Sequence, residues 1–83
     1  MTEYAQSQGW WVYRTYNSQH SEPGMPDLFM VRPPNVILAE LKREKGKVTP
    51  AQATVLALLE ECFGVEVHLW RPSDWDEIEW RLR

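Results

Sequence analysis

The chain has 83 residues, 43% of them hydrophobic, with five tryptophans and a formal net charge of −3. This composition excludes an intrinsically disordered chain. The length predicts one domain, residues 1–83, whose core is only just large enough for stable folding, so self-association would help it. No apolar run approaches a membrane span and the N-terminus lacks a signal-peptide pattern, so we expect a cytoplasmic protein without a membrane partner.

The first predicted elements are a strand over residues 9–16 and a loop over residues 17–26. Along the strand, Trp11, Tyr13 and Thr15 alternate with the residues of the opposite face, and at most a short helix precedes it. The loop consists of turn-forming residues.

A hairpin is predicted next, from two apolar runs of strand length at residues 28–32 and 36–41. Two prolines and an asparagine separate the runs and cannot continue a ladder. Counting back along both strands from this turn places Asp27 opposite Glu40, with cross-strand side chains roughly 5 Å apart. Two carboxylates are therefore expected to meet at one end of the sheet.

Asp27 and Glu40 would raise each other's pKa if nothing positive lay between them. A divalent cation answers this repulsion, and carboxylate oxygens with room for water suit Mg²⁺ or Mn²⁺. Zinc is unexpected, because the chain holds one cysteine and two histidines. The alternative is a solvated Glu-x-Lys pair, but Glu40 ends a run typical of a buried strand, where a charge is costly unless paired or liganded.

Lys42 lies two residues after Glu40 and therefore on the same face of the strand. A cation can polarise a phosphoryl oxygen and lower the pKa of bound water. A lysine can orient that water or neutralise the charge that develops on phosphorus. Asp27, Glu40 and Lys42 together indicate phosphodiester chemistry.

The charge of the chain is unevenly distributed. Residues 1–59 carry six basic and five acidic residues, whereas residues 60–83 carry three basic and seven acidic ones. The segment 42–47 is cationic and lies beside the predicted site. It is either a polar loop or a phosphate-contacting segment, and both can hold. The candidate DNA contacts are Arg14, Ser18, His20, Ser21, Arg43, Lys45 and Lys47.

Residues 49–52 predict the start of a helix, with Thr49 as the N-cap and Gln52 completing a capping box. The cap explains Gln52 by itself, and a role of the same amide in the site would compete with it. The helix is expected to run to about Cys62, with Cys62 buried. Its inner face is predicted to be Val55, Leu58, Leu59 and Cys62.

A further strand is predicted at residues 65–70 and a last helix beyond Pro72. The strand–helix–strand link predicts that the last strand lies parallel to the strand of Glu40. The expected fold class is α/β: a single mixed-sheet domain with a hairpin, a helical crossover to a parallel strand and a C-terminal helix. The inner stripe of that helix is predicted to be Trp75, Ile78 and Leu82.

Three motifs together resemble a known family: Gly24-x-Pro26-Asp27, Glu40-x-Lys42 and Thr49-Pro50-x-Gln52. They look like the VRR-NUC branch of the PD-(D/E)XK nucleases, in the minimal form found in phages and bacteria, from about Gly9 to the C-terminus. The resemblance implies a restriction-endonuclease-like fold, DNA as substrate and Mg²⁺ or Mn²⁺ as cofactor. The implied catalytic residues are Asp27, Glu40, Lys42 and Gln52, with the main-chain carbonyl of Leu41 joining Asp27 and Glu40 as metal ligands.

One feature departs from that family, whose members carry a further acidic residue on a longer N-terminal helix. Here only eight residues precede Gly9, and Glu3 is the sole acid among them. This spacing is short for a ligand. We expect either water in that coordination position or a weakened metal site.

The first hypothesis is a divalent-metal-dependent DNA endonuclease that is selective for branched or four-way-junction DNA and acts as a homodimer. Trp80 favours the dimer, because it falls outside the predicted stripe of the last helix and leaves an aromatic surface to cover. The second is a catalytically weak DNA-binding or replication accessory module that retains the nuclease fold. The third is an RNA or nucleotide hydrolase. Metal binding by the isolated protein separates the first two.

Overall fold

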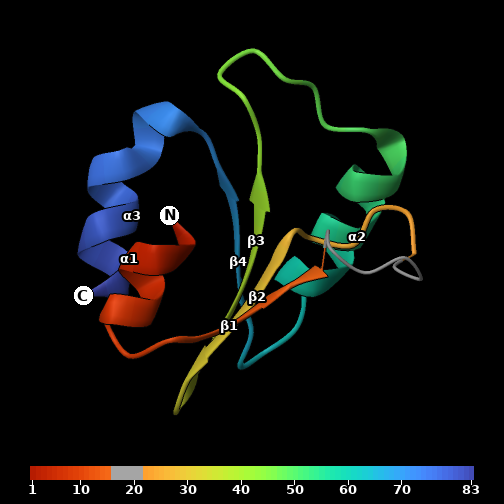
Figure 1. The fold of residues 1–83 in the computed structure, drawn as a ribbon. Helices are drawn as coiled ribbons and strands as arrows, with labels where there is room; N and C mark the ends of the chain where they lie inside the picture. Colours follow the sequence, from red (N-terminus) through yellow and green to blue (C-terminus); the bar gives the residue numbers. More distant parts are fainter. Residues whose placement is uncertain (16–21) are drawn as a thin grey trace.

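Four strands form one mixed sheet in the order β1-β2-β3-β4 (Figure 1). The structure is a computed structural model, and it describes residues 1–15 and 22–83. β1, β2 and β3 are antiparallel neighbours, whereas β3 and β4 run parallel. The elements are α1 (Thr2–Ser7), β1 (Trp11–Arg14), β2 (Leu28–Arg32), β3 (Asn35–Leu41), α2 (Pro50–Glu60), β4 (Glu66–Trp70), a 3₁₀ turn (Pro72–Asp74) and α3 (Trp75–Leu82).

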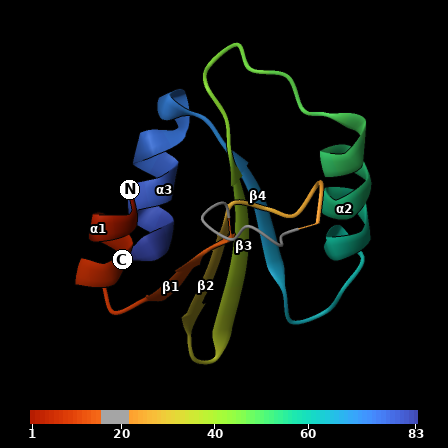
Figure 2. The ribbon, with the colours of Figure 1, turned by 45° about the vertical axis from the view of Figure 1, so that its right-hand side comes forward.

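The helices divide between the two faces of the sheet. α1 and α3 lie together on one face and α2 lies on the other, as Figures 1 and 2 show. The buried apolar core occupies the α1/α3 face, so α2 covers a separate and thinner layer. The core residues are Ala5, Trp10, Leu28, Met30, Ile37, Ala39, Trp70, Ile78 and Leu82.

The predicted pairing of the strands is confirmed. In the hairpin Arg32 pairs with Asn35 and Leu28 pairs with Ala39, so the next positions of the two strands are Asp27 and Glu40. β4 joins β3 in parallel after the α2 crossover. The α/β fold class with a mixed sheet and a C-terminal helix is therefore confirmed.

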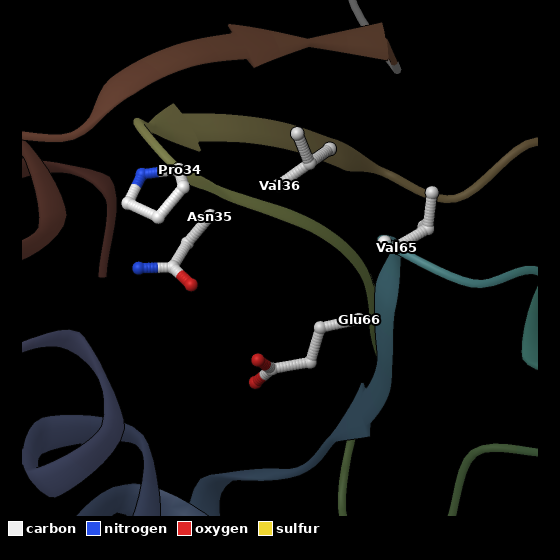
Figure 3. A pocket seen from close by; sticks show the side chains of 6 residues that line it. Pro34, Asn35, Val36, Val65 and Glu66 are labelled. Atoms are coloured by element: carbon white, nitrogen blue, oxygen red, sulfur yellow. The ribbon is translucent and has the colours of Figure 1, made fainter.

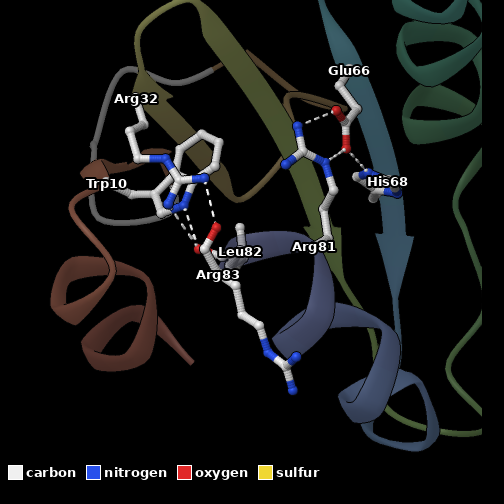
Figure 4. Close-up of polar contacts among 7 residues, drawn as sticks. All are labelled: Trp10, Arg32, Glu66, His68, Arg81, Leu82 and Arg83. Carbon is white, nitrogen blue, oxygen red and sulfur yellow. Dashed lines mark hydrogen bonds and ion pairs between the residues drawn. The ribbon is translucent and has the colours of Figure 1, made fainter.

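Polar contacts fasten the C-terminus to the core face (Figure 4). Arg32 donates hydrogen bonds to the main-chain carbonyls of Leu82 and Arg83 at 3.1 and 2.8 Å, and the indole N–H of Trp10 donates to Leu82 at 2.9 Å. Arg81 makes two hydrogen bonds of 2.6 Å to Glu66, and they hold the pKa of that carboxyl below its usual value. These contacts make Arg32 and Arg81 part of the fold and hold the end of α3 on the core face, away from α2.

The predicted inner face of α2 is wrong in two positions. Leu58 is 61% exposed, and Cys62 lies exposed beyond the end of the helix. Apolar residues occur all around α2, so hydrophobic periodicity alone cannot select a face. The side chain of Gln52 points at the sheet and fixes the rotation of the helix, and the residues three, four and seven positions later follow it inward. The partly buried set is Gln52, Val55, Leu56 and Leu59.

Two further differences concern the length of the first strand and the packing of Trp75. The first strand is shorter than predicted, beginning at Trp11 and ending at Arg14. In α3, Ile78 and Leu82 are buried as predicted, but Trp75 is 38% exposed and packs edge-on against Tyr4 of α1. Trp80 lies outside the core as predicted, with 70% of its surface exposed. Among the described residues, no helix combines the length and the apolar composition needed to cross a membrane.

Candidate active site

The predicted carboxylate pair forms at one end of the sheet, on the face that α2 covers. Asp27 directly precedes β2, and its Oδ2 accepts a hydrogen bond of 3.0 Å from the main-chain N–H of Leu41. Glu40 is 1% exposed, and its Oε1 accepts a hydrogen bond of 3.0 Å from Nε2 of Gln52. Oε2 of Glu40 is also buried and receives no hydrogen bond from a donor of the described residues, unless one of the two carboxyl groups is protonated.

The electrostatics of Glu40 reflect this enclosure. Burial raises the pKa of Glu40 to about 7, and the charge of Asp27 and a hydrogen bond with it act in the same direction. The ammonium of Lys42 partly opposes the rise. Glu40 is therefore partly protonated near neutral pH, whereas a bound cation would favour its charged form.

Gln52 serves the helix cap and the carboxylate pair at once. The side-chain Oε1 of Gln52 accepts a hydrogen bond of 2.9 Å from the main-chain N–H of Thr49. The main-chain N–H of Gln52 donates to the hydroxyl of Thr49 at 3.2 Å. Its Nε2 remains for Glu40. The expectation that the two roles compete is wrong, because they use opposite ends of one amide. The cap instead aims the N–H₂ group at Glu40.

A Gln52→Glu variant separates these two roles. Glutamate preserves the capping box, and a bound divalent ion would offset the added charge, so the melting temperature in saturating Mn²⁺ should stay within a few degrees of the wild type. It removes the N–H donor and adds a third carboxylate beside Glu40, so we expect the cleavage rate to fall, measured on the same DNA at saturating metal. A Thr49→Ala variant is the control, since it weakens the cap and leaves the amide of Gln52 in place. Full activity in Gln52→Glu would restrict the residue to the cap.

Close packing in front of Asp27 explains the glycine and proline of its motif. Gly24 has a φ of +91°, and a Cβ on it would lie 2.5 Å from the main-chain oxygen of Ala51 in α2. Pro26 is fully buried, and its carbonyl accepts a hydrogen bond from the hydroxyl of Thr15. The main-chain N–H of Thr15 also donates to the main-chain carbonyl of Asp27 at 2.9 Å. The loop thus joins Asp27 to β1 and to the first turn of α2, which carries Gln52.

The cationic segment follows β3 directly. Lys42 is partly buried, and its main-chain N–H donates to the carbonyl of Trp70 at 3.0 Å. Arg71 donates hydrogen bonds to the carbonyls of Arg43, Glu44 and Gly46 at 2.6, 3.2 and 2.8 Å. The sequence pattern marks Arg71 only as the end of a strand, so this positioning role was missed. The exposed cationic side chains are those of Arg43, Lys45 and Lys47.

Several candidate residues lie elsewhere. Arg14 is on the α1 face of the sheet, where it donates a hydrogen bond of 2.9 Å to the hydroxyl of Thr2. Glu3 is on α1, with a side chain 91% exposed. In the part of the chain that the structure describes, no three acidic, histidine or cysteine residues gather as a metal site. Ser18, His20 and Ser21 lie outside the described residues, and their contacts with DNA stay predictions.

An open depression of about 360 Å³ lies at the other end of the sheet. Figure 3 shows the side chains that line it. It is formed by the β2–β3 turn and the start of β4, whereas the carboxylates lie at the opposite end of β3. The depression therefore takes no part in the candidate site. Its lining residues are Pro34, Asn35, Val36, Gly64, Val65 and Glu66.

Comparison with protein families gives one match: the family model described as the VRR-NUC domain matches residues 5–73. The match spans most of the chain and contains Asp27, Glu40, Lys42 and Gln52. Neither the curated proteins nor the solved structures provide a match.

Proposed function

Because the chain belongs to the VRR-NUC domain family, whose members are nuclease domains that act on DNA, we propose that it is an endonuclease that hydrolyses phosphodiester bonds with Mg²⁺ or Mn²⁺. One observation carries this proposal: two adjacent carboxylates, one of them almost fully buried with an oxygen that lacks a donor, lie beside a lysine. A purely structural pair of this kind would cost stability, since charges in such a place are expensive without a counterion.

The donor set fits a hard divalent ion. Mg²⁺ is bound in proteins by one or two carboxylates and completes its shell with water and substrate phosphate. Asp27 and Glu40 would hold it, together with the main-chain carbonyl of Leu41. When bound, the ion supplies Lewis acidity at the phosphoryl oxygen and activation of the attacking water.

The side chains around the pair have distinct roles in the proposed reaction. Lys42 places a positive charge near Glu40 and neutralises charge on the phosphoryl oxygens. Gln52 orients the carboxylate of Glu40 through its Nε2. The exposed cations of the 42–47 segment contact the DNA backbone, and Arg71 holds the main chain of that segment in place.

A cleavage assay combined with metal titration tests the proposal. Linear, flap and four-way-junction DNA are incubated with the protein and Mg²⁺ or Mn²⁺, and Mn²⁺ binding is followed by isothermal titration calorimetry. Asp27→Asn and Glu40→Gln should each lose Mn²⁺ binding and cleavage, whereas Glu3→Gln should keep both. Unchanged Mn²⁺ binding in the Asp27 and Glu40 variants would exclude this site.

We further propose that the enzyme is a homodimer that cuts branched DNA. α2 supports this assembly, because it has no fully buried residue and apolar side chains also lie on its outer surface. Helices that are apolar all round are normally covered on all sides. Ala53, Ala57 and Leu58 are exposed along the helix, and Phe63 behind it is fully exposed. A two-fold contact through α2 would cover this surface and present two sites to opposing strands.

A Leu58→Glu variant tests this interface. We expect the wild type to sediment well above the 9.8 kDa chain mass at micromolar concentration, and Leu58→Glu to sediment near it. The reason is that a charge buried at the centre of a helix contact has no counterion. Trp80→Ser on α3 is the matched control. Dissociation by Trp80→Ser instead would move the interface to α3, and a wild-type monomer on junction DNA would remove the dimer.

The alternative function is a DNA-binding or replication accessory module with little activity. The donor set of only two carboxylates among the described residues favours it, since a third acidic ligand is missing. It predicts DNA binding without measurable Mn²⁺ affinity, so the titration above decides between the two.

A further inference from the structure

Three aromatic side chains lie on the same face of the sheet as the carboxylate pair. Trp11 and Tyr13 are 59% and 47% exposed, although they belong to a strand of the sheet. The two rings are nearly parallel, at 17° with centroids 6.3 Å apart, and Phe29 of β2 contacts Trp11 edge-on at 84°. α2 packs against β4 at the far side of this face, so it leaves the rings of β1 open.

The strand register connects these rings with the site. Tyr13 pairs with Phe29, which pairs with Leu38, and the next row on this face holds Thr15, Asp27 and Glu40. Adjacent rows on one face are about 7 Å apart along the strands. Tyr13 therefore lies one row from the carboxylates and Trp11 lies two rows from them.

The cationic segment lies on the opposite side of the carboxylates, because it continues β3 beyond Glu40. Along the strand direction the order is the aromatic rings, the carboxylate pair and the lysine-rich segment. Aromatic faces bind unpaired bases by stacking, whereas lysines and arginines bind the phosphate backbone of any strand. Bases in a duplex are stacked on one another and cannot use such rings.

Given the proposed nuclease function, on which this inference rests, we propose that Trp11 and Tyr13 form a base-stacking subsite for unpaired nucleotides next to the scissile phosphate. The substrate class is then DNA in which single-stranded nucleotides adjoin the cut, such as a flap or a splayed arm. The occupant follows from the continuity of the rings with the carboxylate row. On this face, the described residues of β1 and β2 carry no charge, and Asp27 just before β2 is the nearest charged group in these two strands. The face therefore offers no charges that would match a charged peptide.

Binding without metal tests this subsite independently of cleavage. The affinities for a thymidine oligonucleotide and for a blunt duplex are measured by fluorescence anisotropy in EDTA at fixed salt. The Trp11→Ala/Tyr13→Ala double variant should lose roughly tenfold or more in affinity for the oligonucleotide and little for the duplex. Trp80→Ala, an exposed tryptophan on α3, should change neither. Because binding is measured without metal, a failure of the proposed chemistry leaves this test intact.

Quenching of tryptophan fluorescence provides a second readout with a milder change. The thymidine oligonucleotide should quench the wild type, and Trp11→Phe, which keeps a ring and the fold, should lose most of that quenching. Trp80→Phe should retain it. Equal losses on oligonucleotide and duplex, or undiminished quenching in Trp11→Phe, would overturn the subsite. If Trp11→Phe dissociated a dimer in a sedimentation experiment, the rings would be a contact between two copies of the chain. That result would also overturn the subsite.

Discussion

A Lys42→Ala variant is expected to cleave DNA roughly 10²-fold or more slowly than the wild type, because it removes one positive group that stabilises charge in the transition state. Its melting temperature should remain within a few degrees. The contact that joins this end of β3 to β4 is the main-chain N–H of Lys42 to the carbonyl of Trp70, and alanine keeps it. Single-turnover cleavage at saturating Mg²⁺ measures the chemical step, and thermal melting measures the fold.

Lys45→Ala is the matched control for this variant. Lys45 is an exposed lysine of the same segment, so its loss should weaken DNA binding modestly and leave the single-turnover rate at saturating protein nearly unchanged. Equal rates for Lys42→Ala and the wild type would show that the lysine only contacts the backbone. Equal losses in both lysine variants would assign the effect to DNA binding.

A Glu40→Gln variant is expected to be more stable than the wild type at about pH 8 in EDTA, although it should be inactive. Burial and the neighbouring charge of Asp27 raise the pKa of Glu40 from 4.5 to about 7 in the folded protein. A rise of that size corresponds to about 3 kcal/mol, and the amide escapes this cost. The amide also keeps the hydrogen bond from Gln52 and gains an N–H₂ group that can donate to Asp27.

The sign of the pH dependence follows from the two states of Glu40. Below the ordinary pKa of 4.5, which applies to the unfolded chain, the Glu40 carboxyl is protonated in both states. Its contribution to the free energy of unfolding is then fully present. As the pH rises through the folded pKa near 7, the folded protein must bury a charge and loses this contribution. The wild type should therefore lose stability between about pH 5 and about pH 8 relative to Glu40→Gln, and the melting temperatures should separate by roughly 5 °C or more.

Added Mn²⁺ completes this test. It should raise the melting temperature of the wild type at about pH 8, because a ligand that binds only the folded state stabilises it, and it should not raise that of Glu40→Gln. A wild type whose stability relative to Glu40→Gln does not change with pH would contradict the raised pKa of the buried Glu40.

The carboxylate pair could be predicted because a hairpin register is a matter of counting. A turn that contains Pro33 and Pro34 fixes where the ladder ends, and period-two alternation then places Asp27 opposite Glu40. The capping box at Gln52 was equally local, since its donor and acceptor lie within one helical turn. The link of its Nε2 to Glu40 followed only from the packing of α2 on the sheet.

Other features depended on contacts that no local pattern contains. Arg71 holds three carbonyls of a loop more than twenty positions earlier in the chain, and strand or turn propensity gives no indication of it. The role of Gly24 depends on the proximity of Ala51 in a different element. Arg14 is a predicted DNA contact, but the pleat of β1 turns its side chain to the face opposite the carboxylates.

By itself, the sequence determined the approximate elements, the hairpin register, the carboxylate pair and the family, because each depends on spacing along short segments. Only the tertiary structure decided which side of α2 faces the sheet and which aromatic rings remain open. An apolar helix can present any side to a sheet, and here Gln52 selects one by its bond to Glu40. A strand also has two faces, and the exposure of Trp11 and Tyr13 follows from the side on which α1 and α3 pack. Such choices depend on the sum of distant contacts, which no local pattern carries.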